Sequence, residues 1–99
     1  MTQTDKPIAN PLVVLREEFD DWAVLFNPDT AAAVGTNPVG VVVWKMMDGK
    51  KNMAEIVLEV KNRFENAPES VLTEITTFVN KLADSGFVGL ELERKIANA

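Results

Sequence analysis

The sequence predicts an α+β fold of the winged-helix type, in which a three-stranded antiparallel sheet is followed by three helices. The first third of the chain holds short β-favouring segments separated by breakers, whereas apolar residues recur at helical spacing from residue 38 onward. A length of 99 residues fits one domain with one core. We therefore expect a flexible N-terminal arm at residues 1–10, a folded domain at 11–90 and a tail at 91–99.

Three short strands are expected in the first third. Residues 12–15 and 22–26 are apolar or β-favouring, and the mostly charged segment 16–21 between them indicates the turn of a hairpin. A third strand is expected at 32–36, where Asn37-Pro38 ends it. Its small residues have weak β propensity, so this strand should be the feeblest of the sheet.

The first helix is expected at residues 38–47. Pro38 suits the first helical position, with Asn37 or Thr36 as the cap, and Gly49 stops the run.

Two further helices follow. Asn52 and Glu55 match a capping box and predict a helix over 53–64, whose apolar stripe has charges opposite. A restart at Ala67-Pro68-Glu69 opens the third and longest helix, which Gly86 closes.

The C-terminal segment predicts a short strand, because Val88, Leu90 and Leu92 alternate with polar residues or glycine. Strand 22–26 is apolar on both faces, with Trp22, Val24 and Phe26 on one side and Ala23 and Leu25 on the other. We expect Leu90, Leu92 and Ile96 to cover one face, that of Ala23 and Leu25. Pairing of the tail with an open strand edge, or a dimer contact over the sheet, remains an alternative.

The amino-acid composition disfavours several classes of function. The chain has no Cys, His or Tyr, which removes thiol nucleophiles, imidazole bases and the commonest metal ligands, so we expect no catalytic residue, no metal and no cofactor. A net charge of -5 disfavours nucleic acid as a partner. The longest apolar run, Val41-Val42-Val43-Trp44, is far too short to cross a bilayer, and no signal segment opens the chain. We expect a cytoplasmic protein that does not bind membranes.

A set of short motifs resembles the PqqD family, the proteins of pyrroloquinoline quinone biosynthesis and their relatives. The motifs follow the family's order over about residues 11–90. They are Leu15-Arg16, Phe26-Asn27-Pro28-Asp29, Asn37, Met47-Asp48-Gly49, Ala54-Glu55-Ile56-Val57, Phe64, Ala67-Pro68-Glu69, Val71, Phe78, Leu82 and Gly86-Phe87-Val88. Thr36 departs from the family pattern, which has a large aliphatic residue before this Asn.

The resemblance implies a non-catalytic peptide-recognition element. Such domains bind the leader of a ribosomally synthesised precursor peptide and present it to a modifying enzyme, often of the radical SAM class. In the family the leader pairs with the third strand and lies beside the third helix. The peptide-binding residues implied here are Ala32, Ala33, Val34, Gly35 and Thr36 on the strand, and Leu72, Ile75, Phe78, Val79 and Leu82 on the helix. We add Lys81 from its charge, because it is the one cation of that helix and can meet an acidic leader residue.

The residues themselves are compatible with this mode and leave alternatives. A short third strand at a sheet edge offers unpaired backbone groups to an extended peptide. The apolar stripe of the third helix, however, is equally typical of a core. The main rival is a winged-helix DNA-binding regulator, but its recognition helix would carry Glu69, Glu74 and Asp84 against the single base Lys81. A monomer and a homodimer both remain open.

Overall fold

The computed structural model describes residues 2–64 and 69–90, and within them it forms an α+β fold. The elements follow one another as β1 (Pro7–Ala9), β2 (Val14–Glu17), the 3-10 helix η1 (Phe19–Asp21), β3 (Ala23–Asn27), β4 (Ala32–Thr36), α1 (Pro38–Met46), α2 (Met53–Arg63), α3 (Val71–Asp84) and β5 (Val88–Leu90). The predicted order of three sheet strands, three helices and a short last strand is confirmed. Strand β1 was not predicted.

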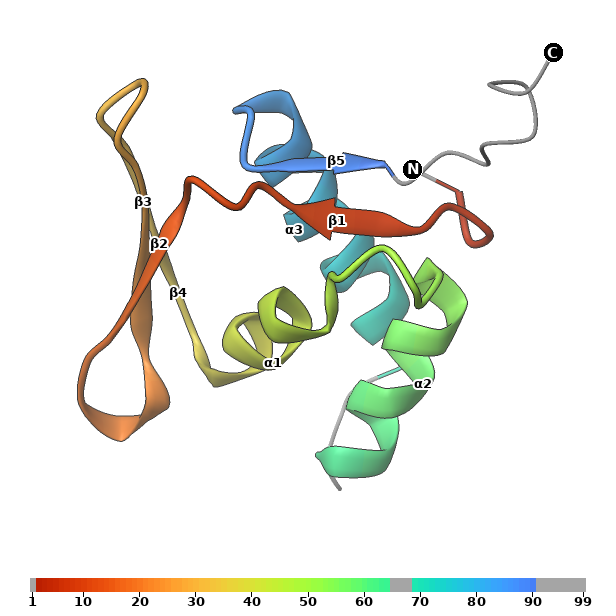
Figure 1. The fold of residues 1–99 in the computed structure, drawn as a ribbon. Helices are drawn as coiled ribbons and strands as arrows, with labels where there is room; N and C mark the ends of the chain where they lie inside the picture. Colours follow the sequence, from red (N-terminus) through yellow and green to blue (C-terminus); the bar gives the residue numbers. More distant parts are fainter. Residues whose placement is uncertain (1, 65–68, 91–99) are drawn as a thin grey trace, which may run out of the picture.

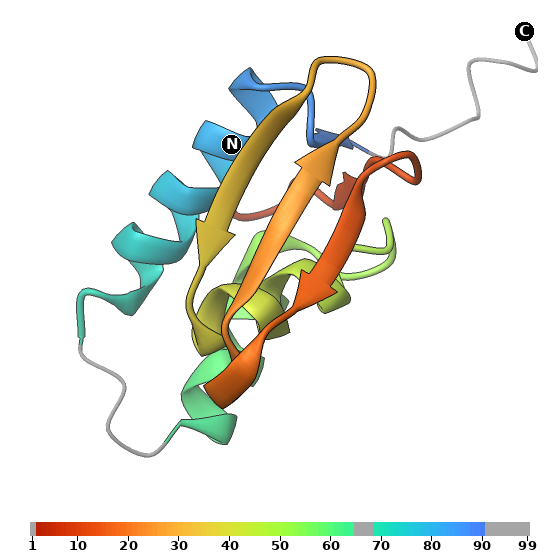
Figure 2. The ribbon, with the colours of Figure 1, turned by 90° about the vertical axis from the view of Figure 1, so that its left-hand side faces the viewer.

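Strands β2, β3 and β4 form an antiparallel sheet with β3 in the centre. The register places Leu25 opposite Leu15 on one side and opposite Val34 on the other. Leu25 is fully buried, because the helices lie on its side of the sheet (Figure 1). Viewed from its open face, the sheet has β4 at one edge, and α3 lies on the same side of the molecule as that edge (Figure 2).

Local signals fix where α1 and α2 begin. The side-chain oxygen of Asn37 accepts the N–H of Gly40 at 2.8 Å, and Pro38 occupies the first helical position. At α2 the two halves of the capping box are both present: Asn52 Oδ1 accepts the Glu55 N–H, and Glu55 Oε1 accepts the Asn52 N–H, each at 2.8 Å. Both predicted helix starts are confirmed.

Helix α3 begins later than the sequence suggested. Its first residue is Val71, and Ser70 precedes it without capping it. Glu69 lies in a turn, while Ala67 and Pro68 fall outside the described residues. The helix ends before Gly86, whose φ of 80° belongs to the left-handed region that glycine adopts readily.

One hydrophobic core lies between the inner face of the sheet and the helices. Helix α3 contributes a stripe at helical spacing, α1 and α2 face it, and Phe87 closes the end near β5. The largest fully buried apolar side chains are Phe87, Leu25, Met53, Ile56, Leu82, Val43, Val60 and Val79. Leu25 belongs to this core, and Ala23 beside it in the sheet is buried as well.

The N-terminal segment is not a loose arm throughout. Pro7–Ala9 form β1, which pairs with β5 so that Ile8 lies opposite Gly89. On its other side, the Ala9 N–H donates to the Met47 carbonyl at 2.8 Å. The prediction of a flexible segment was wrong for these three residues, because all their partners lie far away along the chain and leave no local pattern.

The predicted C-terminal strand is present as β5, but its partner is β1. Leu90 lies opposite Pro7 and is exposed, so it does not cover Ala23 and Leu25. Leu92 and Ile96 fall outside the described residues. In the part of the chain that the structure describes, no helix is long and apolar enough to cross a membrane.

Candidate functional site

The edge of β4 is open. Strand β3 pairs with one side of β4, and among the described residues no strand pairs with the other side. An unpaired edge presents a row of N–H and C=O groups to which an extended peptide can add.

The hydrogen bonds of the hairpin show which way the backbone groups of β3 point. The N–H of Glu18 donates to the carbonyl of Trp22 at 2.7 Å, so the polar groups of Trp22 face β2. Backbone groups of successive residues in a strand point to opposite sides. The residues of β3 that face β4 are therefore Ala23, Leu25 and Asn27.

This alternation continues into β4. The residues opposite that set are Thr36, Val34 and Ala32, whose backbone groups face β3. Ala33 and Gly35 therefore direct their N–H and C=O groups to the open edge. A bound strand would find two donors and two acceptors there.

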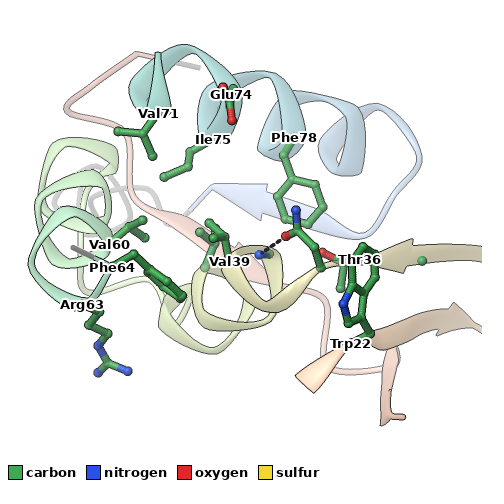
Figure 3. Close-up of a pocket in the computed structure, with 14 residues that line it drawn as sticks. Trp22, Thr36, Val39, Val60, Arg63, Phe64, Val71, Glu74, Ile75 and Phe78 are labelled. Carbon is green, nitrogen blue, oxygen red and sulfur yellow. Dashed lines mark hydrogen bonds between the residues drawn. The ribbon is translucent and has the colours of Figure 1, made fainter. Parts of the chain in front are cut away.

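A cavity of about 970 Å³ lies at the C-terminal end of this edge. Gly35 and Thr36 of β4 border it, and α3 forms the opposite wall with Val71, Ile75 and Phe78 (Figure 3). The other lining residues are Trp22, Asn37, Val39, Gly40, Val43, Val60, Arg63, Phe64 and Glu74. Most of these side chains are apolar, so the cavity suits an apolar side chain of a peptide lying along β4.

The polar groups at the cavity are few and already engaged. Asn37 caps α1, the Glu74 carboxylate accepts the Ser70 hydroxyl at 2.6 Å, and Arg63 donates to Glu59 at 3.1 Å. Arg63 and Glu74 are exposed, so they border the entrance and can change partner when a ligand arrives.

A family model named Coenzyme PQQ synthesis protein D (PqqD) matches residues 23–88, from the start of β3 into β5. The chain belongs to the PqqD family. The resemblance seen in the motifs is confirmed, and the matched segment contains β4, all three helices and nearly the whole wall of the cavity.

Among solved structures, this PqqD-family chain is similar to one described as "TbiB1 in Complex with the TbiA(beta) Leader Peptide". The two share 24% sequence identity, with a TM-score of 0.66 over 87% of this chain and 96% of that chain. The likeness shows that the fold is shared. No curated protein matches the chain.

The structure brings part of the expected peptide-binding set together. Gly35, Thr36, Ile75 and Phe78 line one cavity, and Ala33 lies on the same open edge. Ala32 and Val34 are half-buried on the inner face of β4.

The remaining helix residues lie elsewhere on α3. Val79 and Leu82 have no exposed surface and belong to the core. Leu72 is half-buried and lies about 120° around the helix from Phe78, on the flank away from the cavity wall. Lys81 is exposed and does not border the cavity.

Sequence reasoning missed Trp22, Val39 and Phe64 as cavity residues. They come from three separate segments of the chain, and only folding brings them together. One local signal was available: Gly40 lies in the first turn of an apolar helix, where a glycine is unfavourable unless another group passes close by.

Proposed function

We propose that this PqqD-family chain is a non-catalytic adaptor that binds the leader of a ribosomally synthesised precursor peptide by strand addition to β4. The open edge of β4, with an apolar cavity along its C-terminal half, is the observation that carries the proposal. Backbone pairing at Ala33 and Gly35 supplies affinity, and the cavity selects the side chain that enters it.

The family supports this function, because PqqD proteins belong to the synthesis of a peptide-derived cofactor, and the solved structure with the same fold is described with a leader peptide. The partner that we propose for the bound leader is a peptide-modifying enzyme of the radical SAM class, which supplies the chemistry.

A DNA-binding function finds no support. Along α3, the helix that would enter the major groove, Glu74 and Asp84 outnumber Lys81. Phosphate contacts need clustered Lys and Arg, and they supply most of the non-specific affinity for DNA. The face of α3 therefore repels a duplex.

The deciding experiment is calorimetry of the purified protein with the leader half of the precursor peptide encoded beside its gene. We expect one-to-one binding that is lost when the leader sequence is scrambled. Equal heats for the leader and its scrambled version, or none for either, would contradict the proposal. A fluorescent DNA duplex titrated under the same low-salt conditions tests the rival function directly.

A further inference from the structure

We propose that the peptide bound at β4 carries an aromatic side chain opposite Gly35, on the outer face of the sheet. The inference rests on the proposed function and adds to it a second point of recognition, on the outer face of the sheet, where Gly35 and Trp22 border the cavity.

The geometry of β4 divides the side chains of an added strand between two faces. Ligand residues that pair with Ala33 and Gly35 point to the same side as those two residues, which is the outer face. Ligand residues opposite Val34 and Thr36 point inward, toward the core and the cavity. A bound peptide must therefore satisfy two different surfaces with alternate residues.

On the outer face of the sheet, the side chains of β4 are small and those of β3 are large. Ala33 and Gly35 are the two residues that β4 presents there, and both are small. Their partners in β3 are Phe26 and Val24, and Phe26 is 40% exposed. The face therefore forms a step beside the open edge, with apolar side chains behind it.

Gly35 is the deepest point of this step. A β-carbon built on Gly35 finds no atom within 4 Å, so the space above it is open. Trp22 is 53% exposed and lines the same cavity as Gly35. By strand alternation Trp22 shares the outer face with Val24, which makes it a diagonal neighbour of Gly35.

A glycine in a strand has no side chain to cover its own backbone or to pack against its cross-strand neighbour. An aromatic side chain on the adjacent strand can lie over the glycine and fill this space. Opposite Gly35, a ring on the bound peptide can cover the glycine and reach Val24 and Trp22. A small or charged residue at that position leaves the step empty. Aromatic pairs also gain from edge-to-face contact, which Trp22 can supply.

The test is a selection of random dodecapeptides displayed on ribosomes against the immobilised full chain. The same selection is run on Gly35→Val, which places a side chain where the ring should lie. Val14→Ala, on the outer face but on the far strand, is the matched control. Trp22→Ala is a second variant that removes the aromatic neighbour without touching the β4 edge. Circular dichroism checks that each variant is folded.

We expect peptides from the parent and from Val14→Ala to share one aromatic position flanked by apolar residues. In direct binding, replacing that aromatic by Ala weakens affinity about two- to tenfold on the parent. On Gly35→Val and Trp22→Ala the same replacement has little effect. A nuclear Overhauser contact between the ring and the Gly35 α-protons identifies the register.

Two results would overturn the inference, and they differ. In the first, the selected peptides compete with the leader but show no aromatic preference, or they keep that preference on Gly35→Val. This result would support strand addition to β4 and contradict the aromatic contact on the outer face. If no peptide is selected by any of the four proteins, the peptide-binding function fails with it.

Discussion

Gly40 lies so close beneath Thr36 that no β-carbon fits between them. A Cβ built on Gly40 would overlap the Thr36 hydroxyl and come within 3.2 Å of the Phe78 ring. The contact joins the end of β4, the first turn of α1 and the wall of the cavity at one point. The spacing of β4 from α1 therefore depends on a missing side chain.

Gly40→Ala should destabilise the protein. In a helix interior this exchange normally stabilises by about 1 kcal/mol, but here the overlap with Thr36 forces β4 or α1 to move, which costs about 1–3 kcal/mol. The measurement is the free energy of unfolding in urea. Gly35→Ala is the control, because its new methyl group meets nothing within 4 Å. Equal stability of the two variants would contradict this prediction and show that the Thr36 side chain can move aside at little cost.

Proline substitutions along β4 test which backbone groups face the ligand. Ala33→Pro removes an N–H that points to the open edge, so the sheet should stay folded while leader affinity falls. Val34→Pro removes an N–H that faces Leu25 in β3, so it should lower the melting temperature. Circular dichroism and calorimetry with the leader separate the two effects. A stable Val34→Pro with weakened binding would reverse the assignment of the two sides.

The cap of α1 should contribute measurably to stability. Asn37→Ala removes the acceptor for the Gly40 N–H and should cost about 1 kcal/mol of unfolding free energy. Asn37→Asp keeps a good cap and serves as the control. Because Asn37 also borders the cavity, loss of leader binding in both variants would mean that the amide itself contacts the peptide.

Removing the end of β5 should weaken the fold without altering the ligand edge. A chain truncated after Val88 loses the pairing of Gly89 and Leu90 with β1, so its melting temperature should fall below that of a chain truncated after Leu90. Leader affinity should be the same in both, since β5 is not a neighbour of β4. Tighter leader binding after the shorter truncation would instead indicate competition for the edge.

Acid should weaken the protein in part through Asp48. The N–H of Lys50 donates to the Asp48 carboxylate at 2.9 Å, and with the charge of Lys51 nearby it lowers the pKa of Asp48 below its ordinary 3.8. A lowered folded pKa adds stability at neutral pH, and this is lost as pH falls through that pKa. Urea unfolding between pH 6 and about pH 3 should show a shallower loss for Asp48→Asn than for the parent. Parallel curves would assign the acid sensitivity to other carboxylates.

The parts of the fold that could be predicted are those whose causes are local. Asn37 with Pro38, and Asn52 with Glu55, name the starts of two helices because each cap contacts residues within the next turn. The start of α3 was misplaced because an acidic residue after a proline suggested a first turn, whereas the helix begins after Ser70. Strand β1 was not predicted, because Ile8 pairs with Gly89 near the other end of the sequence.

The candidate site was predictable as a strand edge but not as a cavity. Strand 32–36 is the last of the meander, so an open edge follows from topology. Which residues of that edge face outward depends on the register with β3, and the hydrogen bond from Glu18 to Trp22 had to be seen before it could be assigned. The stripe of α3 could not be divided between core and groove until its rotation about its own axis was known.

The pairing of β1 with β5 places Pro7, near the start of the described residues, opposite Leu90 at their end. Figure 1 shows this two-stranded ribbon apart from the β2–β3–β4 sheet. A module whose ends meet can be spliced into a surface loop of another protein, or joined to it at either terminus, without separating its own strands. Such a fusion would leave Ala33 and Gly35 open, and a tethered enzyme would meet each captured peptide at a high effective concentration.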